Sequence, residues 1–245
     1  MLRIELAVVL LLWAALAQAQ PSHPPPIVAP LEANEEIVSV ETRPGVSVRM
    51  VLVKPEGEPK GIFPLYPGGL GRVITSGGHI IRAAFGRSSA RHFPAHGFIA
   101  AIVDVPSDEV RGLDDVMRLD GPRLGDPRLR GIVLAGSKAV SGGGHRFRDL
   151  YFLPLGRIKL PVLIVHHEND GCLWTSFQGA QRLPKRFESS SKVDFLPVQG
   201  GHPPLSPNAC DGSWTPHDFF GKEAEVVAAA IAWATGAAVP ERIVA

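Results

Sequence analysis

The sequence predicts an α/β protein with a doubly wound, mostly parallel sheet. Segments with strand-like and helix-like patterns alternate along its 245 residues. Two segments, 98–105 (FIAAIVDV) and 162–166 (VLIVH), are continuous apolar runs typical of strands buried on both faces. Glycine-rich or acidic turns follow several strand ends, where such sheets place reactive groups. With 45% hydrophobic residues, the chain is long enough for one sizeable domain.

The first expected elements are a hairpin and a crossover unit. Residues 36–53 alternate apolar and polar side chains around Pro44-Gly45, which is typical of an antiparallel hairpin at a sheet edge. Residues 61–66 form a short apolar strand that leads into a glycine turn. A short helix over 88–96 and the strand 98–105 follow. Strand, helix and strand together imply a parallel crossover.

The second half continues the alternation. A weak helix around residues 114–119 comes first. The strand 131–135 and a glycine-rich loop follow it. The strands 162–166 and 193–198 and a closing amphipathic helix over 219–234 complete the chain. We expect them to complete the doubly wound sheet.

The N-terminus has the pattern of an export signal. Arg3 precedes an apolar stretch over 6–16 and small residues that offer A-x-A cleavage sites, so 1–19 is predicted to be a signal peptide. Residues 20–35 form a proline-rich leader, and 36–245 form the domain. We therefore expect a secreted or periplasmic protein with no stable membrane span after cleavage; an uncleaved anchor is the alternative.

The charge balance argues against a nucleic-acid partner. The formal net charge is +1, from 25 basic and 24 acidic residues, and no run of like charges stands out. The sequence therefore has no basic patch of the kind that binds nucleic acid or an anionic membrane surface. A small-molecule substrate or ligand is the expected partner, and no cofactor is predicted.

Asp170 and His217 are the candidate acid and base. Asp170 follows the strand 162–166, and His217 lies just before the last helix, which is the order of the second and third members of a Ser-Asp-His triad. A carboxylate there orients a histidine ring that transfers protons. The competing interpretations are an ordinary Asn-Asp-Gly turn for Asp170, and His202 in place of His217.

Two cysteines in an exported chain suggest one disulfide. Cys172 lies two residues after Asp170 and Cys210 seven before His217, so a bridge would join the acid loop to the histidine loop. Two unpaired buried thiols are the alternative.

His166 and His167 are adjacent on one strand and therefore point to opposite faces. They cannot easily share a metal ion, and neither an HxH nor an HExxH spacing occurs, so no metal site is predicted. We expect one to be buried and hydrogen-bonded and the other to be partly exposed.

The remaining chemical groups are an oxyanion region and a nucleophile. Gly68 and Gly69 follow an early strand, where backbone N–H groups could hold an oxyanion; a plain tight turn is the alternative. Only the stretch 135–139 (AGSKA) approximates the small-x-Ser-x-small elbow, which makes Ser137 the candidate nucleophile. Three glycines follow where a helix should begin, and they weaken this assignment.

From Val46 onward the chain resembles a family of exported bacterial α/β-hydrolases of the serine-hydrolase type. The motifs that carry the resemblance are YPGGLG, VDVPSD, IVLAGS, PLGRIKLPVLIVHHENDGC, the later cysteine and HDFFGKEAEVV. The resemblance implies an α/β-hydrolase fold, with Asp170 as the triad acid and His217 as the base.

The chain departs from that family between VDVPSD and IVLAGS. Such hydrolases carry a helix, a central strand, an elbow of the GTSRG type and another helix there, which need roughly 35 residues. Only residues 109–130, 22 in all, fill this interval. We therefore expect a fold reduced by the loss of a central strand-helix segment, including the nucleophile elbow.

Three interpretations of function follow. In the first, the protein descends from serine hydrolases of carboxylic esters and is inactive because the elbow serine is missing. In the second, Ser137 has taken over as the nucleophile. The third belongs to another class: a non-catalytic protein of the cell envelope that binds a small molecule or a partner.

Overall fold

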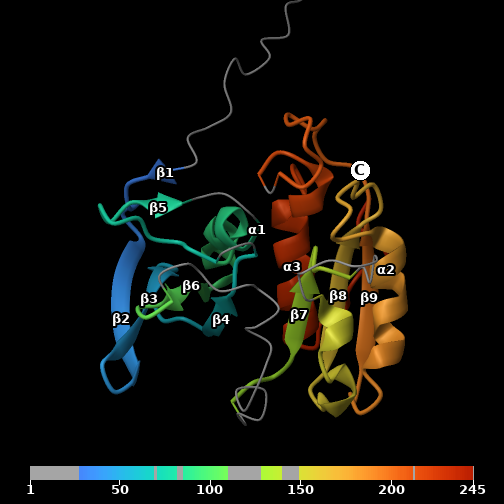
Figure 1. The fold of residues 1–245 in the computed structure, drawn as a ribbon, viewed down its shortest axis with the longest axis horizontal. Helices are drawn as coiled ribbons and strands as arrows, with labels where there is room; N and C mark the ends of the chain where they lie inside the picture. The colour runs from blue at the N-terminus through green and yellow to red at the C-terminus, as the bar shows by residue number, and fades with distance from the viewer. Residues whose placement is uncertain are drawn as a thin grey trace, which may run out of the picture.

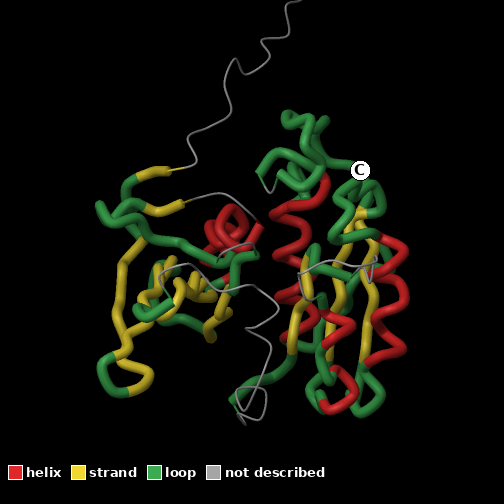
Figure 2. The backbone as a smooth tube through the Cα atoms, viewed as in Figure 1, coloured by secondary structure: helices red, strands yellow, loops and turns green. Residues whose placement is uncertain are grey.

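The computed structural model describes residues 28–244 except 69–70, 82–84, 110–127, 140–148 and 212. Its strands form two main sheets that lie side by side, with helices around and between them (Figures 1 and 2). The predicted signal peptide and the predicted weak helix over 114–119 lie outside the described residues.

The first main sheet has four strands in the order β2-β3-β6-β4. β2 (Glu35–Arg43) and β3 (Val46–Val53) form the predicted hairpin, in which Gly45 provides the positive φ of 72° at the turn. β3 pairs antiparallel with β6 (Phe98–Pro106), and β6 pairs in parallel with β4 (Gly61–Leu65). A separate pair joins β1 (Val28–Ala29), within the predicted leader, to β5 (Ile80–Ile81).

The second main sheet is fully parallel. β7 (Ile132–Ala135), β8 (Val162–His167) and β9 (Val193–Val198) lie in this order, with Ile132 opposite Val162 and Val162 opposite Val193. Their carboxyl ends therefore meet at one edge. This edge carries the candidate acid.

Three α-helices and several short 3₁₀ turns complete the described structure. The α-helices are α1 (Phe85–Ser88), α2 (Phe177–Arg182) and α3 (Glu223–Ala234). The 3₁₀ turns are η1 (Ser89–His92), η2 (Pro94–His96), η5 (Leu150–Phe152), η6 (Leu155–Arg157), η7 (Leu183–Arg186) and η8 (Pro216–Asp218).

β8 is buried on both faces, as its unbroken apolar sequence predicts. Val162 and Ile164 pack into a core that contains Ala180 and Leu183, on the α2 side of the sheet. The alternate residues of β8 pack into another core together with α3. Since side chains alternate along a strand, this register also decides where the two histidines at its end point.

α3 connects the two sheets. Val227 and Ile231 belong to the core of the four-stranded sheet, whereas Val226, Ala229 and Ala230 belong to a core of the three-stranded sheet. Figure 1 shows β4 and β7 as the inner edges of the two sheets. No described strand pairs with both β4 and β7. Side-chain packing, and not a shared ladder of hydrogen bonds, therefore joins the two sheets.

The predicted α/β class is confirmed, with local departures. The sheet is divided into two main parts. The helix predicted over 88–96 is instead two 3₁₀ turns, because Pro94 lacks a backbone donor and Gly97 adopts a left-handed φ of 83°. The last helix begins at Glu223 rather than at 219, because Phe219 and Gly221 have positive φ values of 60° and 81°.

Candidate active site

Asp170 lies in the turn that ends β8. Its backbone N–H donates to the carbonyl of His167, which closes a tight turn directly beyond the strand. The turn brings the carboxylate back over the end of the sheet, where the side chain has 0% exposed surface. A strand end therefore delivers a buried carboxylate to the edge at which parallel sheets place their reactive groups.

His217 reaches the same place from the segment between β9 and α3. It lies in η8, and the chain then turns sharply through Phe219, the one described non-glycine residue with positive φ. Phe219 is fully buried and packs against Phe85 with ring centroids 4.9 Å apart. This buried anchor fixes the direction of the loop that carries His217.

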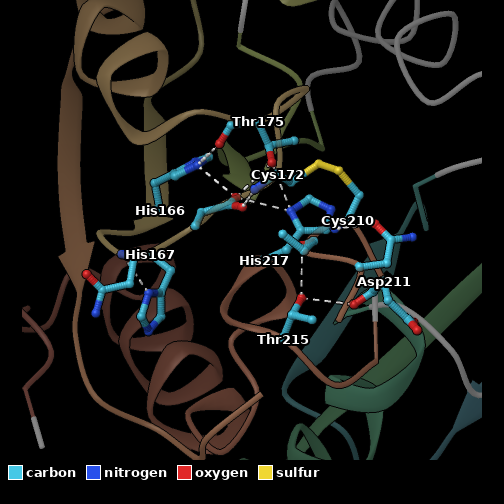
Figure 3. A network of polar contacts seen from close by, with 12 residues as sticks. His166, His167, Cys172, Thr175, Cys210, Asp211, Thr215 and His217 are labelled. Carbon is cyan, nitrogen blue, oxygen red and sulfur yellow. Dashed lines mark hydrogen bonds and ion pairs between the residues drawn. A yellow bond between two sulfur atoms is a disulfide. The ribbon is translucent and has the colours of Figure 1, made fainter. Parts of the chain in front are cut away.

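The two side chains meet. Nδ1 of His217 lies 3.1 Å from Oδ2 of Asp170, and Figure 3 shows the imidazole beside Thr175. Thr175 donates its hydroxyl to the same Oδ2 at 2.7 Å, and its Oγ1 lies 3.0 Å from Nδ1 of His217. The backbone N–H of Cys172 donates to Oδ1 at 2.9 Å. The proximity expected of an acid and its histidine is therefore present.

The environment keeps Asp170 ionised. Burial alone would raise its pKa, but hydrogen bonds from His166, His217 and the N–H of Cys172, together with the electrostatic effect of His217, hold the pKa well below its usual range. The imidazole of His217 is 17% exposed, so one side of the ring is accessible. A charged acid behind a partly exposed imidazole can orient the ring and stabilise its protonated form.

The disulfide ties the acid loop to the histidine loop. Cys172 and Cys210 are bonded, with Cα atoms 4.6 Å apart, as the sequence predicted (Figure 3). Thr215, which is buried, hydrogen-bonds through Oγ1 to the carbonyls of Ala209 and Asp211. The segment that leads to His217 is therefore fixed both covalently and by hydrogen bonds.

His166 and His167 point to opposite faces, as predicted, but both are buried, at 1% and 2% exposure. The expectation that one would be partly exposed is wrong, because cores cover both faces of β8 up to its end. Nε2 of His166 contacts Oδ2 of Asp170 at 3.2 Å. His167 bonds to the carbonyl of Gly200 on the other face, and burial lowers its pKa.

His202 lies elsewhere. Its ring packs against Phe220, with centroids 5.1 Å apart, and its backbone N–H donates to the carbonyl of the same residue. The described contacts of Asp170 involve His217 and not His202. The geometry therefore favours His217 over its competitor.

Ser137 and Gly68 lie around this site without completing it. Ser137 follows Gly136 at the carboxyl end of β7, and a Cβ on Gly136 would lie 2.8 Å from the carbonyl oxygen of His217. No hydrogen bond joins the described side chains of Ser137 and His217. Gly68 follows β4, and its partner Gly69 lies outside the described residues.

A chain of contacts links the Gly68 turn to the histidine. A Cβ on Gly86 would lie 3.3 Å from Cα of Pro67, and the neighbouring Phe85 packs on Phe219. The turn after β4 therefore adjoins α1, which adjoins the loop of His217.

A cavity of about 390 Å³ lies at the carboxyl end of β6, and its described lining does not include Asp170 or His217. Its polar lining includes Arg49, which donates to the buried Asp104 at 3.1 Å. This cavity is lined by the Arg49–Asp104 ion pair and not by the acid–histidine pair, so it is not the candidate site.

Within the described ranges there is no group of three or more His, Cys, Asp or Glu side chains suited to a metal ion. In the same part of the chain no helix has the length and apolar character needed to cross a bilayer.

Asp218, beside His217, is a buried carboxyl group whose Oδ2 has no hydrogen-bond partner. Burial raises its pKa to about 7. The folded protein therefore holds a proton there that the unfolded chain releases, and folding stability should fall as pH rises from about 4 to about 7.

We expect Asp218→Asn to remove this pH dependence, because the amide cannot ionise. Thermal unfolding at pH 5 and pH 8 should show the variant gaining over the wild type at the higher pH, by about 1.4 kcal/mol for each pH unit between pH 5 and the folded-state pKa of about 7. If the stability of both proteins changed with pH in the same way, the pKa of Asp218 would not be raised by folding.

No protein-family model and no curated protein sequence matches the chain. The chain is similar in structure to several solved proteins, three of which follow. A dienelactone hydrolase from Anabaena variabilis is 14% identical, covers 81% of this chain and 95% of its own, and has a TM-score of 0.48. DcsB in complex with its substrate analogue is 14% identical, with coverages of 82% and 98% and a TM-score of 0.49. A thermostable esterase is 15% identical, with coverages of 83% and 63% and a TM-score of 0.47.

Two residues of the site were not anticipated from the sequence. Thr175 contacts both Asp170 and His217, and nothing in the sequence distinguishes it from other loop threonines. For His166, the sequence predicted only that one of the two adjacent histidines would be buried and hydrogen-bonded. Its position four residues before Asp170, across a tight turn, was the available signal.

Proposed function

We propose that the protein hydrolyses carboxylic esters or related acyl compounds. His217 acts as general base and then general acid, Asp170 orients it, and Ser137 is the nucleophile. The observation that supports this most strongly is the 3.1 Å contact between Nδ1 of His217 and the buried, ionised Asp170. A histidine held through Nδ1 presents Nε2 to a substrate.

In the first half of the reaction, Oγ of Ser137 attacks the ester carbonyl carbon. Its proton passes to Nε2 of His217, and the carbonyl π electrons move onto oxygen to give a tetrahedral oxyanion. Backbone N–H groups of the Gly68–Gly69 turn are the proposed donors to this oxygen. The intermediate then expels the alcohol, which takes the proton from His217, and an acyl-serine remains.

In the second half, water attacks the acyl-serine. His217 accepts a proton from the water as the new C–O bond forms. The second tetrahedral intermediate then breaks its bond to Oγ of Ser137, and His217 gives that proton to Oγ. The carboxylic acid leaves. The proton of the imidazolium is never passed to Asp170, which stays ionised throughout because its pKa is held low.

The position of Ser137 supports its role in part. It lies at the carboxyl end of β7, next to β8, and the residue before it packs against His217. Ser137 and His217 are not hydrogen-bonded, so the proposal requires the serine loop to move toward the imidazole when substrate binds.

Export is part of the same proposal. The Cys172–Cys210 disulfide supports a protein that matures in an oxidising compartment. The signal-peptide pattern over residues 1–19 agrees with it. We therefore propose a secreted or periplasmic location.

Labelling with a fluorophosphonate tests the proposed nucleophile. Oγ of an activated serine displaces fluoride from phosphorus, and the adduct increases the protein mass. We expect one adduct, located on Ser137 by peptide mass spectrometry and absent in Ser137→Ala. Ser176→Ala is the matched control, because Ser176 follows Thr175 directly, yet it caps α2 by accepting from the N–H of Gly179.

A second function remains a candidate: binding of a small molecule without turnover. The missing hydrogen bond between Ser137 and His217 and the division of the sheet favour it. A protein that is not labelled, hydrolyses no p-nitrophenyl ester and is still stabilised thermally by acyl compounds would establish this second function and overturn the first.

A further inference from the structure

The carboxylate of Asp170 has a second histidine partner that the proposed reaction does not use. Its Oδ2 is contacted by Oγ1 of Thr175 at 2.7 Å, by Nδ1 of His217 at 3.1 Å and by Nε2 of His166 at 3.2 Å. Figure 3 shows His166 and His217 on different sides of the polar network that also contains Thr175. His166 is 1% exposed and cannot itself reach a substrate.

The partners of His166 fix where its proton lies. Nε2 contacts two groups, the carbonyl oxygen of Thr175 and the carboxylate of Asp170. Both are acceptors only, so Nε2 must carry the hydrogen and share it between them. The ring is also held from the side, by packing against Phe177 with centroids 6.2 Å apart.

The tautomer of His217 follows from the same reasoning. The hydroxyl of Thr175 gives its single hydrogen to Asp170, so its Oγ1 can only accept from Nδ1 of His217. Nδ1 faces two acceptors and carries the hydrogen. Nε2 of the neutral ring therefore bears the lone pair, on the side away from Asp170.

We propose that His166 is a positioning residue that holds Asp170 in line with His217. Its Nε2–H joins Oδ2 of the carboxylate to the backbone of Thr175, so that the acid cannot rotate away from the imidazole. His166 thereby acts on His217 through Asp170. A contribution of His166 to catalysis rests on the proposed function. Its effect on the position of His217 does not.

Other charged groups around the pair are few among the described residues. Asp218 adjoins His217 in the chain and influences it electrostatically, and Arg87 faces Asp218. His167 and Glu168 belong to the same strand end but do not contact Oδ2 of Asp170. Of the two adjacent histidines, only His166 has the geometry for the positioning role.

The experiment measures the Nδ1–H proton of His217 by NMR in protein labelled with ¹⁵N-histidine, at neutral pH. In His166→Phe a phenyl ring replaces the imidazole, so the packing is kept but the N–H donor is lost. We expect the His217 proton to exchange with water about tenfold faster than in the wild type. This is the ratio expected when one hydrogen bond to a charged group is lost. His166→Asn, whose amide is too short to reach Asp170, should behave in the same way and serves if the Phe variant does not fold.

Two further variants separate positioning from general structural damage. His166→Gln places an amide N–H near the position of Nε2 and should restore slow exchange. His167→Phe removes two hydrogen bonds of an equally buried ring, one to the carbonyl of Gly200 and one from the backbone N–H of Asn169. Neither involves the carboxylate of Asp170, so the His217 proton should be unchanged. Unchanged exchange in both His166→Phe and His166→Asn, or equal acceleration in His167→Phe, would overturn the proposal.

The same variants distinguish this inference from the proposed function. If the NMR results are as expected but the wild type hydrolyses no ester, the proposed function fails and the positioning role stands. If the wild type is active and exchange is unaffected by the loss of His166, the positioning role fails alone.

Discussion

Asp170→Asn should lower kcat for ester hydrolysis by about 10⁴-fold with little change in KM. The change is nearly isosteric, but one of the two carboxyl positions must now hold an NH₂ group. At Oδ2 it would face the donors of Thr175, His166 and His217, and at Oδ1 it would face the N–H of Cys172. In either orientation a donor opposes a donor, and His217 loses the charge that stabilises its imidazolium.

The same substitution should destabilise the fold by about 3 kcal/mol, because buried donors lose a charged acceptor. Urea unfolding and steady-state kinetics on one preparation separate the two effects. Asp194→Asn is the matched control: Asp194 accepts from Nε1 of Trp233 at 2.6 Å and from Lys192 at 2.9 Å. It lies near the start of β9, opposite Leu163, and not at the carboxyl ends of the strands, so its loss should affect stability and leave kcat unchanged. Wild-type kcat in Asp170→Asn would refute the role of the acid.

Removal of the disulfide has the second large effect. We expect the double variant Cys172→Ala/Cys210→Ala to lose about 4 kcal/mol of stability, because the unfolded chain is released from a loop closed across a separation of 38 residues. For a chain of this length that corresponds to a fall in Tm of about 12 °C. Differential scanning calorimetry of the variant and the wild type measures it.

A reducing agent provides the internal control for this prediction. Reductant should lower the Tm of the wild type to that of the double variant and should not affect the variant itself. Equal Tm values in all four conditions would mean that the hydrogen bonds of Thr215, and not the covalent bond, hold the histidine loop.

The strand β8 and the residues after it could be predicted because local physics determines them. An unbroken apolar run needs burial on both faces, and the Asn-Asp-Gly turn ends it at once, so the position of Asp170 follows from the sequence. The cysteine pair followed from the export pattern. The meeting of Asp170 and His217 then required only that both loops lie at the carboxyl edge of one parallel sheet.

The rest depends on contacts between distant segments. The start of α3 was misplaced because Phe219 adopts a left-handed conformation, which only its complete burial among tertiary neighbours stabilises. Thr175 and His166 became part of the site through a turn whose shape the sequence does not specify. The division between β4 and β7 agrees with the short interval 109–130, although the loss of an elbow segment stays a prediction.

In the proposed function, the lone pair on Nε2 of His217 is the base of an acyl-transfer reaction. The pH dependence of kcat/KM for a p-nitrophenyl ester, compared with the titration of the His217 ring followed by NMR in the same buffer, tests it directly. Activity should rise with the pH at which that ring loses its proton, and the two apparent pKa values should coincide. Turnover that stays constant across the titration of His217 would contradict the claim.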